Sequence, residues 1–190
     1  MEWNRTACTK QSCTVGMIYY SDKSCSTDLD RTKTAIGVVV KDNELIVALT
    51  VPEVAWGGYR TDISGLTNYS SNTNAQTDYN GKSNTAIIVA AHTSESTSTS
   101  AAIYCNKYNT TGTSAGNWYL PAAGEVYDYI YINYSAVKAG WDKVGTTISD
   151  SWFWSSSEIS KYGAWNVCSY SGMTSHEKAT DLSVACFLAI

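Results

Sequence analysis

The clearest pattern along the chain is a pair of apolar runs in its first third. Residues 35–40 (Ala-Ile-Gly-Val-Val-Val) and 44–49 (Glu-Leu-Ile-Val-Ala-Leu) flank the polar residues 41–43. Aliphatic, β-branched runs on either side of a short polar turn are typical of a β-hairpin. Because neither run alternates between apolar and polar residues, the hairpin is predicted to be central and covered on both faces. An apolar island at residues 17–20 predicts a short strand before it.

Helical patterns follow the hairpin. Residues 85–91 are mostly apolar and come directly after Ser83 or Asn84, either of which can cap a helix. A second short helix is predicted over residues 101–108. Residues 124–134 predict a third helix, because the spacing of its apolar residues places them on one face. That helix is expected to restart at residue 135 or 136 and to run toward Trp141.

The remaining segments predict loops and strands. Residues 57–82 are rich in turn-forming residues and predict an irregular surface loop, and the Ser/Thr run 94–100 predicts a second exposed loop. The segment 118–121 is strand-like and stops at a proline. The last forty residues change to a β pattern, with strands expected at 152–155, 164–170 and 183–190. Strands that surround two or three helices indicate an α+β domain with a small C-terminal antiparallel sheet.

Composition narrows the range of partners. The 190 residues carry a net charge of −4, only 16% of them are charged, and no basic run occurs. A nucleic-acid partner is therefore not expected. Direct membrane insertion is not expected either, because no apolar stretch approaches the roughly 20 residues that span a bilayer.

Aromatic and small polar residues are abundant in this chain, whereas charged residues are few. The chain has seven Trp and 14 Tyr among many Ser, Thr, Asn and Gly, with two Phe. This mixture is typical of binding surfaces, in which Tyr and Trp supply rigid contact area and the small polar residues supply hydrogen bonds. It is equally typical of a β-rich exported protein whose Tyr and Thr favour strands.

The strand at 164–170 predicts a candidate binding face. Its period-two alternation places Trp165 and Val167 on one face and Asn166, Cys168 and Tyr170 on the other. Trp and Val belong in a core, so the second face is predicted to be exposed to solvent. Flanking loops are expected to add small polar and aromatic residues, namely Ile159, Ser160, Tyr162, Ser175, His176 and Asp181. The pattern fits a binding surface and an ordinary solvated sheet face equally well.

These motifs carry a resemblance to a known family. The segments 118–126 (Trp-Tyr-Leu-Pro-Ala-Ala-Gly-Glu-Val) and 153–158 (Phe-Trp-Ser-Ser-Ser-Glu), followed by Ala164-Trp165, Gly172, Lys178 and a terminal apolar strand, resemble the Lcl C-terminal domain family. Residues 16–22 and 35–40 resemble the start of such domains, so the resemblance spans residues 15–190. It implies a C-type lectin-like fold of the formylglycine-generating-enzyme-like branch, found in exported or surface proteins that bind ligands.

Some relatives are variable proteins of diversity-generating retroelements. In those proteins, mutated template adenines scatter Asn codons over the binding face. Several residues here belong to the set reachable from an AAC codon, whereas Trp165, Glu177 and Lys178 do not and are expected to be scaffold. The reachable set is Ile159, Tyr162, Gly163, Asn166, Cys168, Ser175, His176, Asp181 and Ser183. The same residues are also common in any loop rich in Ser, Gly and Thr.

The resemblance also guides the reading of the six cysteines. An even number of cysteines in a polar chain favours an oxidising compartment. Cys105 precedes the family-like helix and Cys186 lies in the last strand, so a Cys105–Cys186 bridge is expected. Cys25 is then expected to pair with Cys13 or Cys8, and Cys168 is expected to be a free thiol on the exposed face.

Catalytic and metal sites find little support in the sequence. There is no GxSxG motif, and His92 is expected to be a loop or cap residue while His176 lies on the binding face. Glu125 starts a helix and Glu158 follows the Trp-Ser-Ser-Ser strand, so structural roles are expected for both. The strand Trp165-Asn166-Val167 lacks the acidic residue of calcium-dependent lectins, and Asp28 and Asp30 are a weak alternative cluster.

Together these features predict a polar segment at residues 1–15 and one α+β, C-type lectin-like ligand-binding domain at 16–190. No catalytic residue, metal or cofactor is expected. The partner is expected to be a protein or a glycan that binds the C-terminal face of an extracellular, cell-surface or virion protein. The alternatives are a glycan-binding adhesin of fixed specificity and a formylglycine-type oxidase. The predicted contact residues are Ile159, Ser160, Tyr162, Gly163, Asn166, Cys168, Tyr170, Ser175, His176, Asp181 and Ser183.

Overall fold

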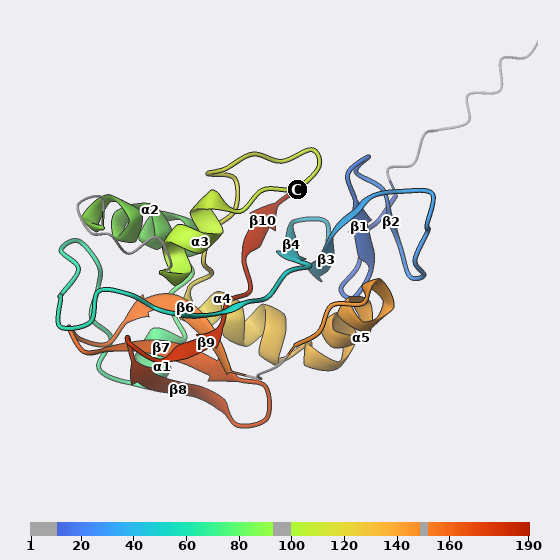
Figure 1. Cartoon of the computed structure of the whole chain (residues 1–190). Coiled ribbons are helices and arrows are strands. Elements are labelled where there is room, and N and C mark those ends of the chain that lie inside the picture. The colour runs from blue at the N-terminus through green and yellow to red at the C-terminus, as the bar shows by residue number, and fades with distance from the viewer. Residues whose placement is uncertain (1–10, 93–99, 149–151) are drawn as a thin grey trace, which may run out of the picture.

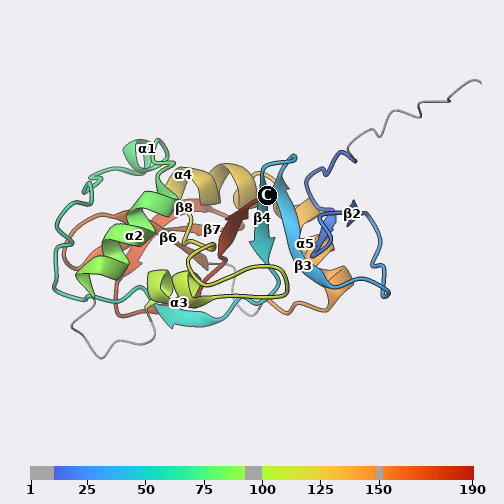
Figure 2. The same cartoon turned by 90° about the horizontal axis from the view of Figure 1, so that it is seen from above.

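The computed structural model describes residues 11–92, 100–148 and 152–190, and these form a mixed α+β fold with two five-stranded sheets (Figure 1). The two sheets lie toward opposite ends of the molecule, and the last strand is the edge strand of the first sheet on the side that faces the second (Figure 2). The first sheet contains β1 (Ile18–Tyr20), β2 (Cys25–Ser26), β3 (Ala35–Lys41), β4 (Leu45–Ala48) and β10 (Phe187–Ala189). The second contains β5 (Glu53–Ala55), β6 (Trp152–Glu158), β7 (Gly163–Cys168), β8 (Gly172–Glu177) and β9 (Asp181–Ser183). The helices are α1 (Asn72–Ala75), α2 (Gly81–Ala91), α3 (Ala101–Lys107), α4 (Ala123–Glu125), the π-helix η1 (Val126–Tyr131) and α5 (Tyr134–Val144).

The predicted central hairpin is confirmed as β3 and β4. The strand order of the first sheet is β10-β4-β3-β1-β2, and residues 36–40 of β3 are all buried. Helix α5 covers one face, where the indole nitrogen of Trp141 donates to the backbone oxygen of Ala48 at 3.0 Å. Because neighbouring strands and a helix cover this hairpin, a continuous apolar run is what its position requires. The predicted strand at residues 17–20 is confirmed as β1.

The last predicted strand, 183–190, is divided between the two sheets. Strand β9 pairs with β5 and β6 in the second sheet, whereas β10 pairs with β4 in the first. Residues 184–186 cross between the sheets, and all three are buried. The sequence prediction also missed β8, which pairs with β7 along its whole length. β8 is a polar edge strand without clear alternation, so it gave no strand signal.

The predicted helix at 124–134 begins as α4 and continues as η1. The carboxylate of Glu125 reaches back to accept a hydrogen bond from the backbone N–H of Ala122 at 2.7 Å, which fixes the start of the helix. Val126 and Ile130 are both buried, as their spacing predicted. The next helix, α5, starts at Tyr134, one residue before the earlier of the two predicted restarts.

The segment 57–82 is mostly irregular and exposed, as its composition predicted, but part of it is helical and some of its side chains are buried. It contains α1, and Ile63, Ala75 and Asp78 within it are buried. The carboxylate of Asp78 accepts hydrogen bonds from Ser157 at 2.7 Å and from Asn84 at 2.9 Å, so it ties this segment to β6 and α2. Turn-forming residues predicted the irregular, exposed backbone correctly but gave no sign of these few buried anchor residues.

The short helix predicted at 101–108 is confirmed as α3, whose cap residue Ser100 accepts a hydrogen bond from the N–H of Ile103. Helix α2 begins at Gly81, before the predicted cap residues. The rest of the exposed loop predicted at 94–100 lies outside the described residues. Within the described part of the chain, no helix combines the length and the apolar character that crossing a bilayer requires.

Two disulfides hold the ends of the domain. Cys105–Cys186 joins α3 to the segment that crosses between the sheets, and Cys13–Cys25 joins the N-terminal segment to β2. Both agree with the pairings expected from the sequence, with Cys13 as the partner of Cys25. Cys168 belongs to neither bridge, and Cys8 lies outside the described residues. Two disulfides in a domain of this size indicate folding in an oxidising compartment.

The two disulfides close loops of very different length. Residues 105 and 186 are 81 positions apart, whereas residues 13 and 25 are 12 apart. The double variant Cys105→Ala/Cys186→Ala is therefore expected to lose more free energy of unfolding than Cys13→Ala/Cys25→Ala, by about 2 kcal/mol from loop-closure entropy. Urea unfolding of the two variants measures this difference. Equal losses would contradict the entropic argument.

Glu125 gives the fold a pH dependence. Burial raises the pKa of this carboxyl from 4.5 to about 7, against the hydrogen bonds from Ala122 and Tyr119 that favour its charge. At a pH between these two pKa values, the Glu125 carboxyl has lost its proton in the unfolded chain but keeps it in the folded protein. The free energy of unfolding is therefore expected to fall as the pH rises from about 4.5 to 7, by up to roughly 3 kcal/mol from this group.

The variant Glu125→Gln isolates this contribution. Its urea midpoint is expected to change less between pH 5 and pH 8 than the midpoint of the unmodified protein. A variant with the same pH dependence as the unmodified protein would show that the carboxyl keeps an ordinary pKa.

Candidate binding surface

A buried ion pair anchors the loop beside the second sheet. Glu158 ends β6 and Lys178 follows β8; both side chains have no exposed surface and their charged groups are in contact. The ammonium of Lys178 also donates to the backbone oxygen of Thr61 at 2.8 Å and lies 4.5 Å from the centre of the Trp56 ring. The backbone N–H of Ile63 donates to the Glu158 carboxylate. This pair therefore holds residues 56–63 against the ends of two strands.

Burial works against both charges in this pair. It raises the pKa of Glu158 and lowers the pKa of Lys178, while each charge favours the ionised form of the other. Such a pair adds little net stability over an apolar one, but removing one partner leaves a buried charge uncompensated. Its effect is to fix one loop geometry. The scaffold role expected for Lys178 and the loop-ordering role expected for Glu158 both agree with these contacts.

Two tyrosines lie on the outer side of the anchored loop. The rings of Tyr59 and Tyr162 are 6.0 Å apart and tilted by 58°, and 39% and 46% of their surfaces are exposed. Arg60 lies over the Tyr59 ring at 5.6 Å and Lys161 over the Tyr162 ring at 5.0 Å. In the described part of the chain, neither cation forms a salt bridge. We call Tyr59, Arg60, Lys161 and Tyr162 the aromatic edge.

A tight turn between β6 and β7 presents Tyr162. The backbone N–H groups of Ile159 and Ser160 both donate to the oxygen of Gly163, at 3.1 and 3.2 Å. A side chain at Gly163 would collide with Ile159, because a Cβ there would lie 2.8 Å from that residue's Cγ2. Lys178 donates its backbone N–H to the oxygen of Tyr162 at 2.9 Å, which connects the turn to the ion pair. The predicted residues Ile159, Ser160, Tyr162 and Gly163 therefore form one unit, in which only Tyr162 is widely exposed.

The exposure predicted for Asn166 and Cys168 is wrong. Both side chains are buried, as are Trp165 and Val167 on the opposite face of β7. β7 lies between β6 and β8, and the rings of Trp152 and His176 from those strands meet edge to face, 4.9 Å apart, across this face. The amide nitrogen of Asn166 and Nδ1 of His176 are 2.9 Å apart, within hydrogen-bond distance. Alternation placed the residues on the correct faces but could not show that both faces are covered. Side chains of β6 and β8 cover Asn166, and Ala75 and Ala123 pack against Trp165 on the other face.

The other predicted contact residues are divided in the same way. Gly163 and Ser183 are buried, Ser175 and His176 are partly buried, and Asp181 is exposed. Ser175 and His176 lie within β8, and Asp181 begins β9, so none of the three is in a loop as predicted. Ser183 lies in β9, a strand that is paired on both sides, and it has no exposed surface.

Tyr170 does not belong to the aromatic edge. It is 77% exposed, as predicted, but it lies in the turn after β7, whereas Tyr162 lies just before β7. A six-residue strand separates the two tyrosines, a distance of about 20 Å. The two exposed tyrosines therefore lie at opposite ends of β7 and do not form one contiguous aromatic cluster.

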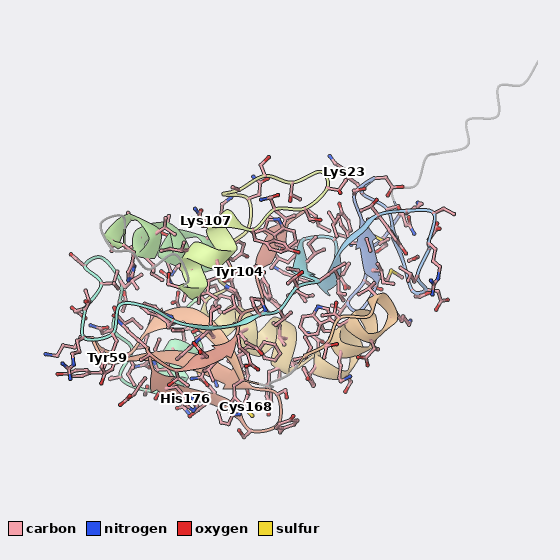
Figure 3. All side chains as sticks on the ribbon, viewed as in Figure 1. Lys23, Tyr59, Tyr104, Lys107, Cys168 and His176 are labelled. Atoms are coloured by element: carbon pink, nitrogen blue, oxygen red, sulfur yellow. A yellow bond between two sulfur atoms is a disulfide. The ribbon has the colours of Figure 1, made fainter. Side chains whose placement is uncertain are left out.

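The sequence prediction missed Tyr59 and Arg60, which lie about a hundred residues before Tyr162. The sequence signal that could have found them is Gly57-Gly58, directly before an aromatic and a cationic residue. In the structure both glycines have positive φ, which marks a specific turn rather than a random loop. Figure 3 shows Tyr59 at one end of the molecule and His176 and Cys168 along the lower side of the second sheet.

The side chains considered for chemistry have structural roles. His92 is buried at the C-terminal end of α2, where Nδ1 lies 2.8 Å from the oxygen of Ile88, which agrees with its expected place as a cap residue. Cys186 is bonded to Cys105, so it does not form a redox pair with Cys168 of the kind that a formylglycine-type oxidase would require. No group of three or more His, Cys, Asp or Glu side chains in the described residues is arranged to hold a metal ion.

Comparison with known proteins gives a fold relationship. No family model matches the chain, and no curated protein matches it. The structure is similar to that of a fimbrial protein from Bacteroides ovatus ATCC 8483, with a TM-score of 0.67 at 15% sequence identity. The match covers 93% of this chain and 49% of that one, so the chain spans about half the length of this solved structure. At this identity the likeness establishes a shared fold.

The ion pair predicts a specific pattern of stability changes. Glu158→Gln leaves the Lys178 ammonium buried without its partner and is expected to lower the free energy of unfolding by roughly 3–5 kcal/mol. The double variant Glu158→Met/Lys178→Met is expected to lose much less. Lys138→Ala removes an exposed pair with Asp142 and serves as a control, with an expected loss below about 1 kcal/mol. Urea unfolding measures all three, and a double variant less stable than the single one would contradict this assignment.

Proposed function

We propose that this chain is a non-catalytic recognition domain of an exported or surface-displayed protein, and that it binds its ligand at the aromatic edge. The observation that supports this is the pair of exposed tyrosines, each with a cation over its ring, on a loop fixed by a buried ion pair. Exposed aromatic residues on a rigid support are typical of binding hot spots, because little entropy is lost when they contact a partner.

The exported location has two independent supports. The two disulfides need an oxidising compartment. The fold is shared with a protein whose name describes it as fimbrial, which is a surface role. The finer assignment, a C-type lectin-like domain of the Lcl C-terminal family, remains our proposal on the resemblance of residues 118–126 and 153–158.

Diversification of the surface by a retroelement is also proposed, for a smaller set of positions than the sequence suggested. Buried positions such as Asn166 and Ser183 cannot vary freely without disturbing the sheet. The positions with exposed or partly exposed side chains are Ile159, Tyr162, Ser175, His176 and Asp181. A non-expressed repeat with adenines in these codons, next to a reverse-transcriptase gene, would support this idea; invariant codons across strains would contradict it.

The ligand is proposed to be a glycan or a protein, and the arginine and lysine of the aromatic edge favour acidic groups on it. Binding to an array of neutral and acidic glycans, and to an array of purified cell-surface proteins, tests the recognition role directly. On whichever array binding occurs, Tyr162→Ala is expected to lower affinity by at least tenfold, because the ring is lost from the centre of the surface.

Tyr170→Ala is the matched control, since it removes an equally exposed tyrosine at the other end of β7. It is expected to bind as well as the unmodified protein. Loss of binding in Tyr170→Ala with full binding in Tyr162→Ala would place the ligand elsewhere. No binding on either array would count against a recognition function.

A further inference from the structure

The last strand leaves part of a sheet edge open. Leu188 in β10 and the flanking residues Cys186 and Ile190 direct their backbone groups toward β4 and its flanking turn, as shown by the bonds from Ala48 to Cys186 and from Ile190 to Glu44. Phe187 directs its N–H and C=O the opposite way, where both bond to Tyr119 at 2.9 and 3.0 Å. Alternation makes Ala189 the next residue on that outer edge. No backbone partner for it occurs among the described residues.

The segment beside Phe187 turns away before it can pair with Ala189. An antiparallel strand through Tyr119 would place Asn117 opposite Ala189. Instead Asn117 closes a turn with Ser114, in which the N–H of each residue bonds to an oxygen of the other at 3.1 and 2.8 Å. The outer edge of the first sheet is therefore covered at one position and open at the next.

Cavities lie on both sides of this open position. One, of about 380 Å³, is lined by Tyr19, Ile36 and Leu188. The other, of about 430 Å³, is lined by Leu45, Tyr79 and Tyr129. Both include Tyr119, Ala189 and Ile190. Successive side chains of a strand point to opposite faces, so a strand paired with Ala189 would direct alternate side chains into the two cavities.

The two cavities differ in charge. Lys23 and Lys82 line the first, and no Asp or Glu side chain does. Neither lysine forms a salt bridge in the parts of the chain that the structure describes, although the protein as a whole carries a net charge of −4. In the second cavity the charge of Lys41 is already paired with Glu44. Asn43 and the Glu125 carboxyl also line this cavity, and its other walls are aromatic or aliphatic.

We propose that the outer edge of β10 accepts an added β-strand from an extended polypeptide segment. The acidic side chains of the bound segment enter the cavity of Lys23 and Lys82. Its alternate side chains, which are β-branched, enter the cavity of Tyr79 and Tyr129. Backbone hydrogen bonds to Ala189 supply part of the affinity, and the two cavities supply the specificity. This surface is separate from the aromatic edge, as the positions of Lys23 and Tyr59 at opposite ends of the molecule show (Figure 3).

The probe is the blocked peptide acetyl-Glu-Val-Glu-Val-Glu-Val-amide, titrated into the 190-residue protein and followed by amide chemical shifts. We expect saturable shifts at Ala189, Tyr119 and Tyr19. The peptide in which lysine replaces each glutamate is expected to bind at least tenfold more weakly. Equal binding of both peptides, or no saturable binding of the acidic peptide, would overturn the proposal.

Ala189→Pro tests the backbone contact itself. Proline removes an N–H that points away from β4, so the bonds within the sheet are retained, and proline is tolerated on such an edge. This variant is expected to lose acidic-peptide binding at least tenfold, with an unchanged spectrum in the absence of peptide. Full binding in this variant would show that the lysines capture acidic groups without strand addition.

Reversing the charge of the cavity lysines is a second test of acidic-peptide binding. Lys23→Glu and Lys82→Glu are each expected to weaken acidic-peptide binding at least fivefold, whereas Lys161→Glu on the aromatic edge is expected to have no effect. Tyr162→Ala is also expected to keep peptide binding, so this proposal and the proposed recognition function can fail independently. Self-association of the protein in sedimentation, abolished by Ala189→Pro, would instead identify a second copy of the chain as the occupant.

Discussion

The burial of one carboxylate and one ammonium organises the end of the molecule that carries the aromatic edge. Glu158 and Lys178 sit at the ends of strands β6 and β8, where neither charge can reach water. Each has to be satisfied by the other and by backbone groups, and the nearest ones belong to residues 61 and 63 of a distant loop. Because the two buried charges at these strand ends must be compensated, they fix the position of this loop, which has little regular structure of its own.

The sequence specified the first sheet more clearly than the second. In β3 and β4 the side chains are apolar on both faces, so the pattern conveys both secondary structure and central position. The Cys105–Cys186 bridge followed from the resemblance of the surrounding motifs. In β7, by contrast, polar and apolar residues alternate even though both faces are covered. An asparagine can be buried there because His176 supplies a hydrogen-bond partner from the next strand, and single-strand alternation contains no information about that partner.

The candidate site shows the same limit: the sequence pattern of one segment does not reveal which distant segment packs against it. Tyr162 was identified because it lies in the family-like C-terminal region, but its partner Tyr59 comes from a loop about a hundred residues earlier. Their proximity depends on the buried ion pair, whose two members are themselves twenty residues apart. Tyr170 has the right chemistry and exposure but lies at the wrong end of its strand. The exposure of Tyr162 and Tyr170 could be predicted from the sequence, whereas the burial of Asn166 and Cys168 and the pairing of distant segments could not.

The division of residues 181–189 between the sheets has a consequence for the order of folding. The early hairpin has one of its edges completed by β10, and the second sheet has β9 between β5 and β6, so both sheets need residues from the final tenth of the chain. A growing chain that has not yet produced those residues can form local hairpins and helices only. The native arrangement of both sheets is therefore completed in a late, long-range step of folding.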